Sequence, residues 1–499
     1  MGGFFGVVSS SDCITDLFFG TDYHSHLGNL RGGLMTMGPQ GVKRVIHDIS
    51  NATFRAKFQD DLPYLRGPAN GIGCISDTGD QPLLVHSHHG TYGIVMVGSI
   101  NNLDELTAKA CSDFNVHYAE VGNEGVNPNE VAASIVFSGK TIAEGMRKLQ
   151  RSVCGSCSML MLGDEGLYAM RDAMGRTPIT VGIKEGARAV SFEGCAIYNL
   201  GYTKEYELGP GEAVLVTKDG VKQILPPGDK MQICAFLWVY FGFPASSYEG
   251  RNVEIVRYNC GEKLAKIDKA RNDQSEKEMV VGVPDSGVAH ALGYSNESHI
   301  PYKRAFIKYT PTWARSFIPR DQKDRAHVAT MKLIPIEELI RGRKLLFCED
   351  SVVRGTQLGN TLGRLRKFGV SEIHLRSACP PILYNCRFLN FSKSNGLKGL
   401  IARRAIAKVE GYEFTGNTVE DEAWLANVDM TEYHDEKSGK YAKMVEAMRE
   451  ELSLTSLHFQ SLDDLIEAIG LPREKVCTYC WDGKDECACE HCSGCSHDS

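Results

Sequence analysis

The sequence predicts a protein of two domains, an α+β domain in the first half of the chain and an α/β domain with a parallel sheet in the second. Three observations support this prediction. The chain has 499 residues, more than one compact hydrophobic core usually accommodates. Residues 3–225 hold many short apolar stretches separated by glycine-rich turns. Beyond residue 279, strand-like stretches alternate with helix-like ones, a rhythm typical of parallel sheets.

The composition argues against several classes of protein. Apolar residues make up 42% and charged residues 23%, as in ordinary globular proteins. A net charge of -7 argues against nucleic acid as the main partner. No stretch reaches the roughly 20 apolar residues that cross a membrane, and the nearest to it, residues 233–243, fits a buried element better. Because the first residues also lack the pattern of a secretory signal, we expect a cytoplasmic protein without a membrane partner.

The first half is expected to be rich in strands. Apolar stretches that fit buried strands occur at residues 6–8, 93–96, 158–161 and 214–216. The last of these is followed by Lys218-Asp219-Gly220, and Asp-Gly tolerates the positive φ of a tight hairpin turn. Prolines and a glycine at 226–228 indicate a domain boundary. We therefore predict a first domain over residues 1–228.

The second half alternates regularly between two kinds of segment. Residues 279–283 form a β-branched stretch that ends in Pro284-Asp285-Ser286-Gly287 and leads into helix-compatible sequence. Residues 344–348 repeat the pattern, with a loop and then a helix whose apolar residues recur at helical spacing. Residues 371–378 fit the next strand. Such a parallel sheet binds its ligands at the carboxyl ends of the strands.

The end of the chain differs in composition from what precedes it. We predict a second domain over residues 229–475 and a short, polar, cysteine-dense tail over residues 476–499. The whole chain has 17 cysteines, an odd number with an uneven distribution. This pattern favours metal ligation over the disulfide framework of a secreted protein.

The most informative segment joins the strand at 344–348 to the helix after it. Two adjacent carboxylates are followed by a small polar loop with arginine, glycine and threonine. Amides and hydroxyls at a helix N-terminus can hold a phosphate dianion, and the carboxylates can face ribose hydroxyls or a magnesium-bound pyrophosphate. The alternative is a generic acidic turn before a helix. The candidate substrate-binding residues are Glu349, Asp350, Ser351, Arg354, Gly355 and Thr356.

This loop resembles the signature of type I phosphoribosyltransferases, in which two acidic residues precede Ser-Ile-Val-Arg-Gly-Thr-Thr. Glu349 stands where that family usually has aspartate, and Gln357 replaces the last hydroxyl residue. The first difference lengthens a ligand by a methylene group, and the second removes a phosphate donor. Neither removes the site.

The resemblance extends through most of the chain to the glutamine phosphoribosylpyrophosphate amidotransferase family. In the second half the matching segments are residues 283–287, 291–294, 300–302, 315–318 and 331–333. The family has a mobile lid over the bound pyrophosphate at the place of residues 315–332, which implies catalytic roles for Arg315 and Lys332. A solvated basic loop is the alternative for these side chains. The resemblance also implies magnesium at Ser286, Glu349 and Asp350.

The first half resembles the glutaminase domain of the same family, a four-layer sandwich with an N-terminal nucleophile. The matching segments are residues 3–8, 30–33, 71–73, 171–178 and 210–212. The nucleophile of the family is a cysteine whose own α-amine acts as the base, and Gly2 stands in its place here. Ser76, Val97 and Pro128 stand where the family has a carboxylate-binding arginine, an oxyanion-stabilising asparagine and an acidic residue. We therefore expect the scaffold without glutamine hydrolysis.

The cysteines resemble those of a bacterial subclass of the family that holds a [4Fe–4S] cluster. Cys477 and Cys480 form a Cys-x-x-Cys pair, which by itself also suits zinc or redox chemistry. Cys234 follows the domain boundary and Cys386 follows Pro380-Pro381, as in that subclass. The resemblance thus implies these four thiolates as cluster ligands, with buried, reduced cysteines as the alternative. Four more cysteines lie outside the resemblance: Cys487, Cys489, Cys492 and Cys495. They fit either a second metal site, such as one for zinc, or a disordered tail.

Together these features predict a phosphoribosyltransferase that uses phosphoribosyl pyrophosphate and an amine to form phosphoribosylamine for purine biosynthesis. Ammonia is the expected amine, either free or delivered by a separate glutaminase. Magnesium and a [4Fe–4S] cluster are the expected cofactors, and a homo-oligomer is the expected assembly. Three alternatives stay open: another amine acceptor, a non-catalytic sensor of phosphoribosyl pyrophosphate or nucleotides, and a glutamine-dependent amidophosphoribosyltransferase.

Overall fold

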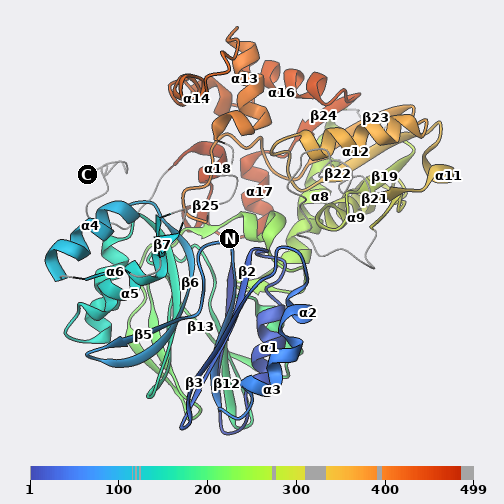
Figure 1. Cartoon of the computed structure of the whole chain (residues 1–499). Coiled ribbons are helices and arrows are strands. Elements are labelled where there is room, and N and C mark those ends of the chain that lie inside the picture. Colours follow the sequence, from blue (N-terminus) through green and yellow to red (C-terminus); the bar gives the residue numbers. More distant parts are fainter. Residues whose placement is uncertain are drawn as a thin grey trace.

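The computed structural model describes residues 2–114, 116–118, 121–122, 125–271, 277–308, 333–389 and 396–484. In the first half of the chain, two antiparallel sheets lie face to face and helices cover their outer faces, which makes four layers (Figure 1). The seven-stranded sheet has the spatial order β13 (Thr203–Glu207), β11 (Thr180–Lys184), β12 (Ala187–Ser191), β1 (Gly3–Ser9), β4 (Asn70–Ser76), β2 (Arg31–Gly38) and β3 (Gly41–Asp48). The six-stranded sheet has the order β15 (Val221–Leu225), β14 (Ala213–Val216), β10 (Gly166–Met170), β9 (Gly155–Gly163), β6 (Gly90–Ile100) and β5 (Leu83–Ser87).

The opening strand β1 lies in the middle of its sheet and is buried on both faces. It pairs with β12 on one side and β4 on the other. Because successive side chains of a strand point to opposite faces, Phe4 and Val8 pack into the core between the sheets, whereas Phe5 and Val7 pack beneath the outer helices. The predicted strands at residues 6–8, 93–96, 158–161 and 214–216 are confirmed by β1, β6, β9 and β14.

Helices cover both outer faces of the sandwich. The six-stranded sheet is covered by α4 (Leu103–Phe114), α5 (Pro128–Phe137) and α6 (Ile142–Ser152). The seven-stranded sheet is covered by α1 (Ile14–Asp22), α2 (Phe54–Phe58), α3 (Leu62–Leu65) and α7 (Gly194–Asn199). A small hairpin of β7 (Val121–Gly122) and β8 (Gly125–Val126) precedes α5.

The predicted hairpin after residue 214 and the buried element near residue 233 are both present. β14 and β15 pair antiparallel, and the Thr217 amide donates to the Gly220 carbonyl at 2.9 Å across the turn. After residues 226–232, which form neither helix nor strand, come β16 (Ile233–Cys234) and a π-helical turn (Leu237–Phe241) that buries Trp238. A short hairpin, β17 (Ser247–Tyr248) and β18 (Arg251–Asn252), then leads into α8 (Val253–Ala270).

The second half is built on a four-stranded parallel sheet, as predicted. Its spatial order is β19 (Met279–Gly282), β22 (Lys344–Glu349), β23 (Glu372–Ser377) and β24 (Ser456–Phe459). The surrounding helices are α9 (Ser286–Ser298), α11 (Glu337–Ile340), α12 (Thr356–Lys367), α13 (Ile401–Val409), α14 (Thr418–Ala426), α15 (Thr431–His434), α16 (Gly439–Glu451) and α17 (Leu462–Ile469). A separate antiparallel pair consists of β20 (Phe306–Lys308) and β21 (Leu333–Pro335).

The described end of the chain returns to the junction between the halves. β25 (Val476–Cys477) pairs in parallel with β16, and the short helix α18 (Tyr479–Asp482) follows it (Figure 1). Residues 476–484 of the predicted tail are therefore packed into the fold.

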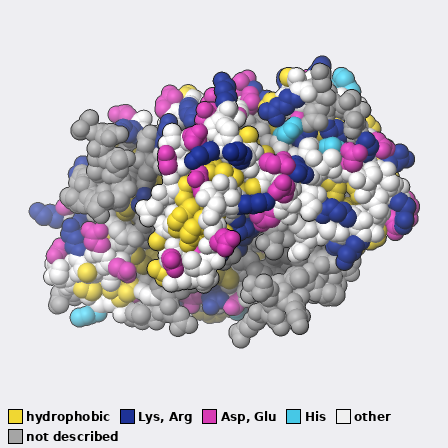
Figure 2. Space-filling model, turned by 90° about the horizontal axis from the view of Figure 1, so that it is seen from above, with side chains coloured by type: hydrophobic (Ala, Val, Ile, Leu, Met, Phe, Trp, Pro, Cys, Tyr) yellow, Lys and Arg dark blue, Asp and Glu magenta, His cyan; other side chains and the backbone are white. Residues whose placement is uncertain are grey.

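Figure 2 shows the molecule from above, so that the second half faces the viewer. Acidic and basic side chains are interspersed on this face. Such a mixture of signs is typical of a solvated face. Among the described residues, no helix has the length and apolar character that crossing a membrane would take.

Candidate functional site

The acidic pair lies at the carboxyl end of β22, beside the start of helix α9. Glu349 is the last residue of the strand, Asp350 follows it, and Ser286 is the first residue of α9. The helix approaches the strand closely because of a glycine: a Cβ on Gly287 would lie 2.5 Å from the backbone oxygen of Cys348. Small residues at this point therefore bring Ser286 to the acidic pair.

Asp350 is the centre of a small hydrogen-bond network. The Ser286 hydroxyl donates to Oδ2 of Asp350 at 2.5 Å, and the Ser351 hydroxyl donates to Oδ1 at 2.6 Å. Asp350 is 4% exposed, and Glu349 keeps a small exposed surface beside it. The sequence predicted these residues as one site, and the structure brings them together.

The surroundings of both carboxyls disfavour their ionised forms. Desolvation raises the pKa of Asp350, and it raises the pKa of Glu349 well above its ordinary value, with a further rise from the Asp350 carboxyl. A divalent cation bound by both carboxyls would favour their ionised forms, because its two positive charges take the place of a shared proton. Carboxylate oxygens suit magnesium, which commonly takes one or two of them together with substrate phosphates. The donor set thus fits Mg²⁺.

The polar loop after the acidic pair is fixed to the helix α13 and ends in a left-handed glycine. Gly355 has φ +75° and caps α12, a conformation that glycine adopts without steric cost. The Ile401 amide donates to the Val353 carbonyl at 2.9 Å, and Arg404 donates to the Arg354 carbonyl at 2.8 Å. Thr356 is the first residue of α12, so the helix N-terminus faces the end of the sheet. Arg315 and Lys332 lie outside the described residues.

Two basic side chains near this edge carried no signal in the sequence. Arg257 of α8 is 3% exposed, donates to three backbone carbonyls including that of Trp238, and lowers the pKa of Asp350 against the larger effect of burial. Lys308, at the end of β20, pairs with Asp285 in the loop before α9. Both are distant in sequence from the acidic pair, so only the fold shows that they belong to this edge.

Gly2, which precedes β1, packs directly against the backbone of Ile75 and Ser76 in β4. A Cβ on Gly2 would lie 2.4 Å from the carbonyl oxygen of Ile75, closer than real Cβ contacts allow. Cys13, just before α1, and Cys74, in β4, are both buried. Burial raises the pKa of Cys13 to about 12 and raises the pKa of Cys74 still higher. Both are therefore neutral thiols rather than nucleophilic thiolates.

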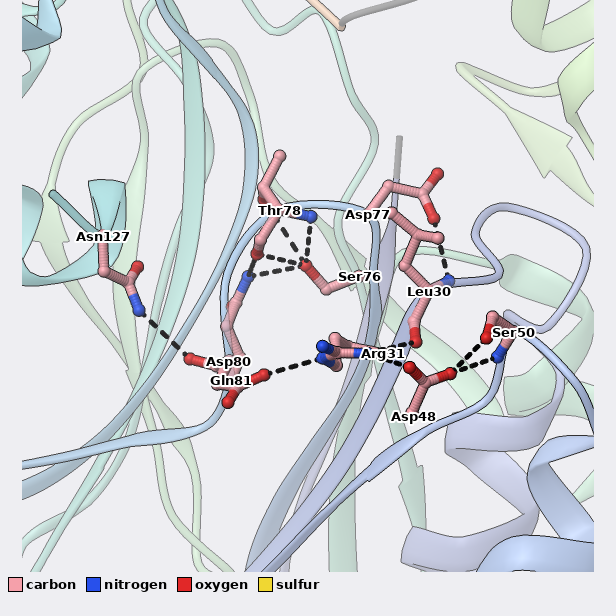
Figure 3. Close-up of polar contacts among 10 residues, drawn as sticks. All are labelled: Leu30, Arg31, Asp48, Ser50, Ser76, Asp77, Thr78, Asp80, Gln81 and Asn127. Atoms are coloured by element: carbon pink, nitrogen blue, oxygen red, sulfur yellow. Dashed lines mark hydrogen bonds and ion pairs between the residues drawn. The ribbon is translucent and has the colours of Figure 1, made fainter. Parts of the chain in front are cut away.

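A network of polar side chains occupies the region between the ends of β4 and β2, as Figure 3 shows. Gln81 is 1% exposed and its side-chain amide donates to the Ser76 hydroxyl at 3.1 Å. Its oxygen accepts from the Met96 amide at 2.7 Å. Arg31 donates to Asp80 at 3.0 Å and to Asp48 at 2.5 Å. These side chains are bonded to one another and to the backbone. Val97 is buried in β6 and Pro128 begins α5.

The four cysteines implied as cluster ligands line one cavity between the two halves. Cys234 and Cys477 are register partners in the β16–β25 pair, Cys480 lies in α18, and Cys386 lies in the loop after β23. The wall of the cavity also includes Arg176, Phe236, Phe388, Leu389 and Tyr479. The amides of Leu383 and Tyr384 donate to the Cys480 carbonyl at 2.9 and 3.1 Å, which fixes the Cys386 loop to α18.

The thiols of this cavity are buried and interact with one another. Hydrogen bonding with Cys386 and burial raise the pKa of Cys480, and burial and the neighbouring thiols raise the pKa of Cys234. Within the described ranges, no three His, Cys, Asp or Glu side chains are arranged to hold a single metal ion. In a [4Fe–4S] cluster each thiolate binds a different iron, so the thiols surround a group larger than an ion. The donor set fits such a cluster.

Comparison with known proteins gives consistent results. Amidophosphoribosyltransferase 1, chloroplastic, of Arabidopsis thaliana is 30% identical over 436 residues, which are 84% of this chain and 73% of the relative. The amidophosphoribosyltransferase of Methanothermobacter thermautotrophicus is 30% identical over 438 residues, 85% of this chain and 81% of the relative. No family model matches the chain.

A solved structure confirms the predicted fold. The glutamine phosphoribosylpyrophosphate amidotransferase from B. subtilis, complexed with ADP and GMP, superposes with a TM-score of 0.78 at 22% identity. The superposition covers 97% of each chain. It thus includes both the four-layer sandwich and the domain with the parallel sheet.

Proposed function

The chain belongs to the amidophosphoribosyltransferase family, and from this premise we propose that it transfers the phosphoribosyl group to ammonia without hydrolysing glutamine itself. In this reaction the bond between C1 of the ribose and pyrophosphate breaks, and a bond between C1 and nitrogen forms. The products are phosphoribosylamine and pyrophosphate, with one proton lost from the nitrogen. The acidic pair, the polar loop and Gly2 carry the proposal.

The acidic pair supports the transfer step. Asp350 is held by the hydroxyls of Ser286 and Ser351, so its carboxylate is oriented before substrate binds. Bound magnesium would neutralise charge that develops on the leaving pyrophosphate. With the cation bound, Glu349 and Asp350 are ionised, and their oxygens can also accept hydrogen bonds from the ribose hydroxyls.

The loop after the acidic pair supports binding of the substrate phosphate. The first backbone amides of α12 have no carbonyl partner within the helix, and together with the positive end of the helix dipole they favour a phosphate dianion. Gly355 and the bonds to Ile401 and Arg404 preorganise the loop. We assign Ser351, Arg354, Gly355 and Thr356 to this phosphate, and Arg315 and Lys332 to the pyrophosphate that leaves.

Two features of the first half support the loss of glutamine hydrolysis. A nucleophilic cysteine would need a Cβ at residue 2, where the carbonyl of Ile75 already stands. The second feature is Gln81, whose carboxamide bonds to Ser76, the residue in place of the carboxylate-binding arginine. It also bonds to the amide of Met96, next to the residue in place of the oxyanion donor. A side chain of the protein itself thus bonds to polar groups at or next to two positions where the resemblance implies glutamine-binding residues.

The cavity of four cysteines supports a [4Fe–4S] cluster, with Cys234, Cys386, Cys477 and Cys480 as its ligands. The cluster would supply a rigid cross-link among three distant segments of the chain and a one-electron redox centre. We assign it no part in the transfer step.

The proposal is tested by measuring pyrophosphate release from phosphoribosyl pyrophosphate and Mg²⁺ by anaerobically purified protein, with ammonia or glutamine as nitrogen donor. We expect turnover with ammonia and none with glutamine. Asp350→Asn should lower the ammonia rate by about 100-fold, the scale of losing a preorganised electrostatic group. Asp219→Asn, in the exposed β14–β15 turn, should leave it unchanged.

Each other outcome has a definite meaning. Equal turnover with glutamine would contradict the loss of glutamine hydrolysis. Binding of phosphoribosyl pyrophosphate without release of pyrophosphate would contradict the transferase and favour a sensor. An Asp350→Asn variant as active as the parent would move the transfer site elsewhere.

A further inference from the structure

An arginine from the first half of the chain reaches into the cysteine cavity. Arg176 is 1% exposed, and its Nη1 donates to Sγ of Cys477 at 2.9 Å. Its guanidinium carbon lies 3.2 Å from the centre of the Phe388 ring, within the range of a cation–π contact. Arg176 and Cys477 are 301 positions apart in the sequence.

The contacts of Arg176 extend to all three segments that carry the cysteines. Its backbone carbonyl accepts the amide hydrogen of Cys234 at 3.1 Å, and Phe388 donates its own amide to Sγ of Cys386 at 3.4 Å. Arg176 thus contacts Cys477 through its side chain and Cys234 through its backbone carbonyl, and it is linked to Cys386 through Phe388.

The turn that delivers Arg176 is rigid. Arg171 is completely buried and donates to the carbonyls of Thr177 at 2.7 Å and Gly175 at 2.8 Å, on both sides of Arg176. The Thr177 amide donates to the Asp172 carboxylate at 3.3 Å. These bonds hold the backbone on both sides of Arg176 and so direct its side chain to the cavity.

We propose that Arg176 is the residue that tunes the cluster: it places a buried positive charge and a hydrogen bond on the Cys477 thiolate and so raises the reduction potential. This inference rests on the cluster proposed above. Reduction adds an electron to a group already bound by four thiolates, and a nearby cation stabilises the reduced form more than the oxidised form. Net charge and hydrogen bonds to the sulfurs are among the factors that set such potentials.

A purely structural arginine would fix the backbone through its carbonyl, which any residue at this position could do. The side-chain contact to sulfur is therefore the feature that the test must isolate.

The test compares Arg176→Met, Arg176→Lys and the parent, all purified anaerobically. Arg176→Met keeps much of the side-chain length and removes the charge and the donor, whereas Arg176→Lys keeps the charge. Iron and acid-labile sulfide are counted first, and the cluster is then reduced stepwise with dithionite and followed by electron paramagnetic resonance. The matched control is Arg188→Met, because Arg188 pairs with Glu205 and does not line the cavity.

At a fixed potential, Arg176→Met should hold at least a tenfold smaller ratio of reduced to oxidised cluster than the parent, which is about 59 mV for a one-electron couple. Arg176→Lys should fall between them, and Arg188→Met should match the parent. A potential that is the same in Arg176→Met and the parent would overturn the inference while leaving the cluster in place.

Absence of iron and sulfide in the parent would overturn both the cluster and the inference. If Arg176→Met does not fold, Arg176→Gln takes its place, because it also removes the charge: a potential equal to that of Arg188→Met would overturn the inference, and a lower one would support it.

Discussion

At the scale of single residues, Asp268 shows how the second domain is held around a buried charge. Its side chain is completely buried and accepts hydrogen bonds from Arg376 at 2.5 Å, Tyr294 at 2.7 Å and His458 at 2.9 Å. Burial alone would raise its pKa, but the bonds from His458 and Arg376 outweigh burial and lower the pKa to about 2. One carboxylate on α8 thus joins α9, β23 and β24.

Replacing this carboxylate should destabilise the protein strongly. Asp268→Asn keeps the shape but leaves the buried guanidinium of Arg376 without its counter-charge. We expect a loss of about 3–5 kcal/mol in the free energy of unfolding, the range for breaking a buried ion pair. Urea denaturation at neutral pH measures it. Asp219→Asn, whose carboxylate is exposed, should change the value by less than about 0.5 kcal/mol, and an equally small effect at Asp268 would contradict the account.

The same carboxylate predicts a particular dependence of stability on pH. Its pKa is near 3.9 in an unfolded chain and about 2 in the fold, so its contribution is complete above about pH 4 and is lost as the pH falls toward 2. The difference in unfolding free energy between the parent and Asp268→Asn should therefore shrink below pH 4. Urea titrations at intervals between pH 7 and pH 3 test this, and a constant difference down to pH 3 would be inconsistent with it.

Restoring a cysteine at residue 2 should not restore glutamine hydrolysis. In Gly2→Cys the new Cβ meets the Ile75 carbonyl, so the start of β1 must shift, at a cost of about 1–3 kcal/mol. Release of glutamate from glutamine should stay at background. Gly220→Cys, at a glycine with open space around it, controls for an added thiol. Measurable glutaminase activity in Gly2→Cys would mean that only the nucleophile is missing.

At the scale of elements, the site depends on how closely helix α9 lies against β22. A Cβ on Gly287 would meet the Cys348 carbonyl at 2.5 Å, and a Cβ on Gly282 would meet Cα of Val288 at 2.6 Å. Gly282 therefore sets the distance of α9 from the end of β19, and Gly287 sets its distance from β22. The hydrogen bond from Ser286 to Asp350 exists because this distance is short.

Widening this contact should therefore impair substrate binding. Gly287→Ala should push α9 away from β22, cost about 1–3 kcal/mol and weaken binding of Mg²⁺ and phosphoribosyl pyrophosphate about tenfold or more. Isothermal titration calorimetry measures the affinity. The matched control is Gly359→Ala in α12, where nothing lies within 4 Å of the new Cβ. It should raise helix stability by about 0.5–1 kcal/mol. Equal affinities in the two variants would argue against a role for the close contact.

At the scale of the whole molecule, β16 and β25 join the point where the chain enters the second domain to the point where it leaves. Their pairing has only two residues in each strand, so we expect a cluster bound in the cysteine cavity beside it to help hold the junction. Cys477→Ser should lower the iron content and the thermal midpoint of the second domain. Cys111→Ser, at an exposed cysteine, is the control and should change neither. Differential scanning calorimetry and iron analysis measure the two effects. An unchanged midpoint in Cys477→Ser would show that the cysteine cavity does not stabilise the junction.

Much of the fold could be predicted because its signals are local. The strand at 344–348, the acidic pair and the polar loop are consecutive in sequence, and the alternation of strands and helices identifies a parallel sheet. The meeting of the four cysteines was predictable only through resemblance, because their spacing contains no information on contact. The contacts of Arg176 and Gln81 were not predictable, since each depends on segments distant in sequence or on backbone groups.

The pairing of Cys234 with Cys477 also bears on the order of events during synthesis. Most of the second domain separates these residues along the chain, and the ribosome makes the first long before the last. A cluster that needs all four thiols cannot be inserted into a nascent chain that still lacks Cys477 and Cys480. Cluster insertion would thus follow the synthesis of Cys480, and a chain truncated after residue 475 should purify without iron. The delivery machinery of the cell would accordingly act on chains in which the second domain has already been made.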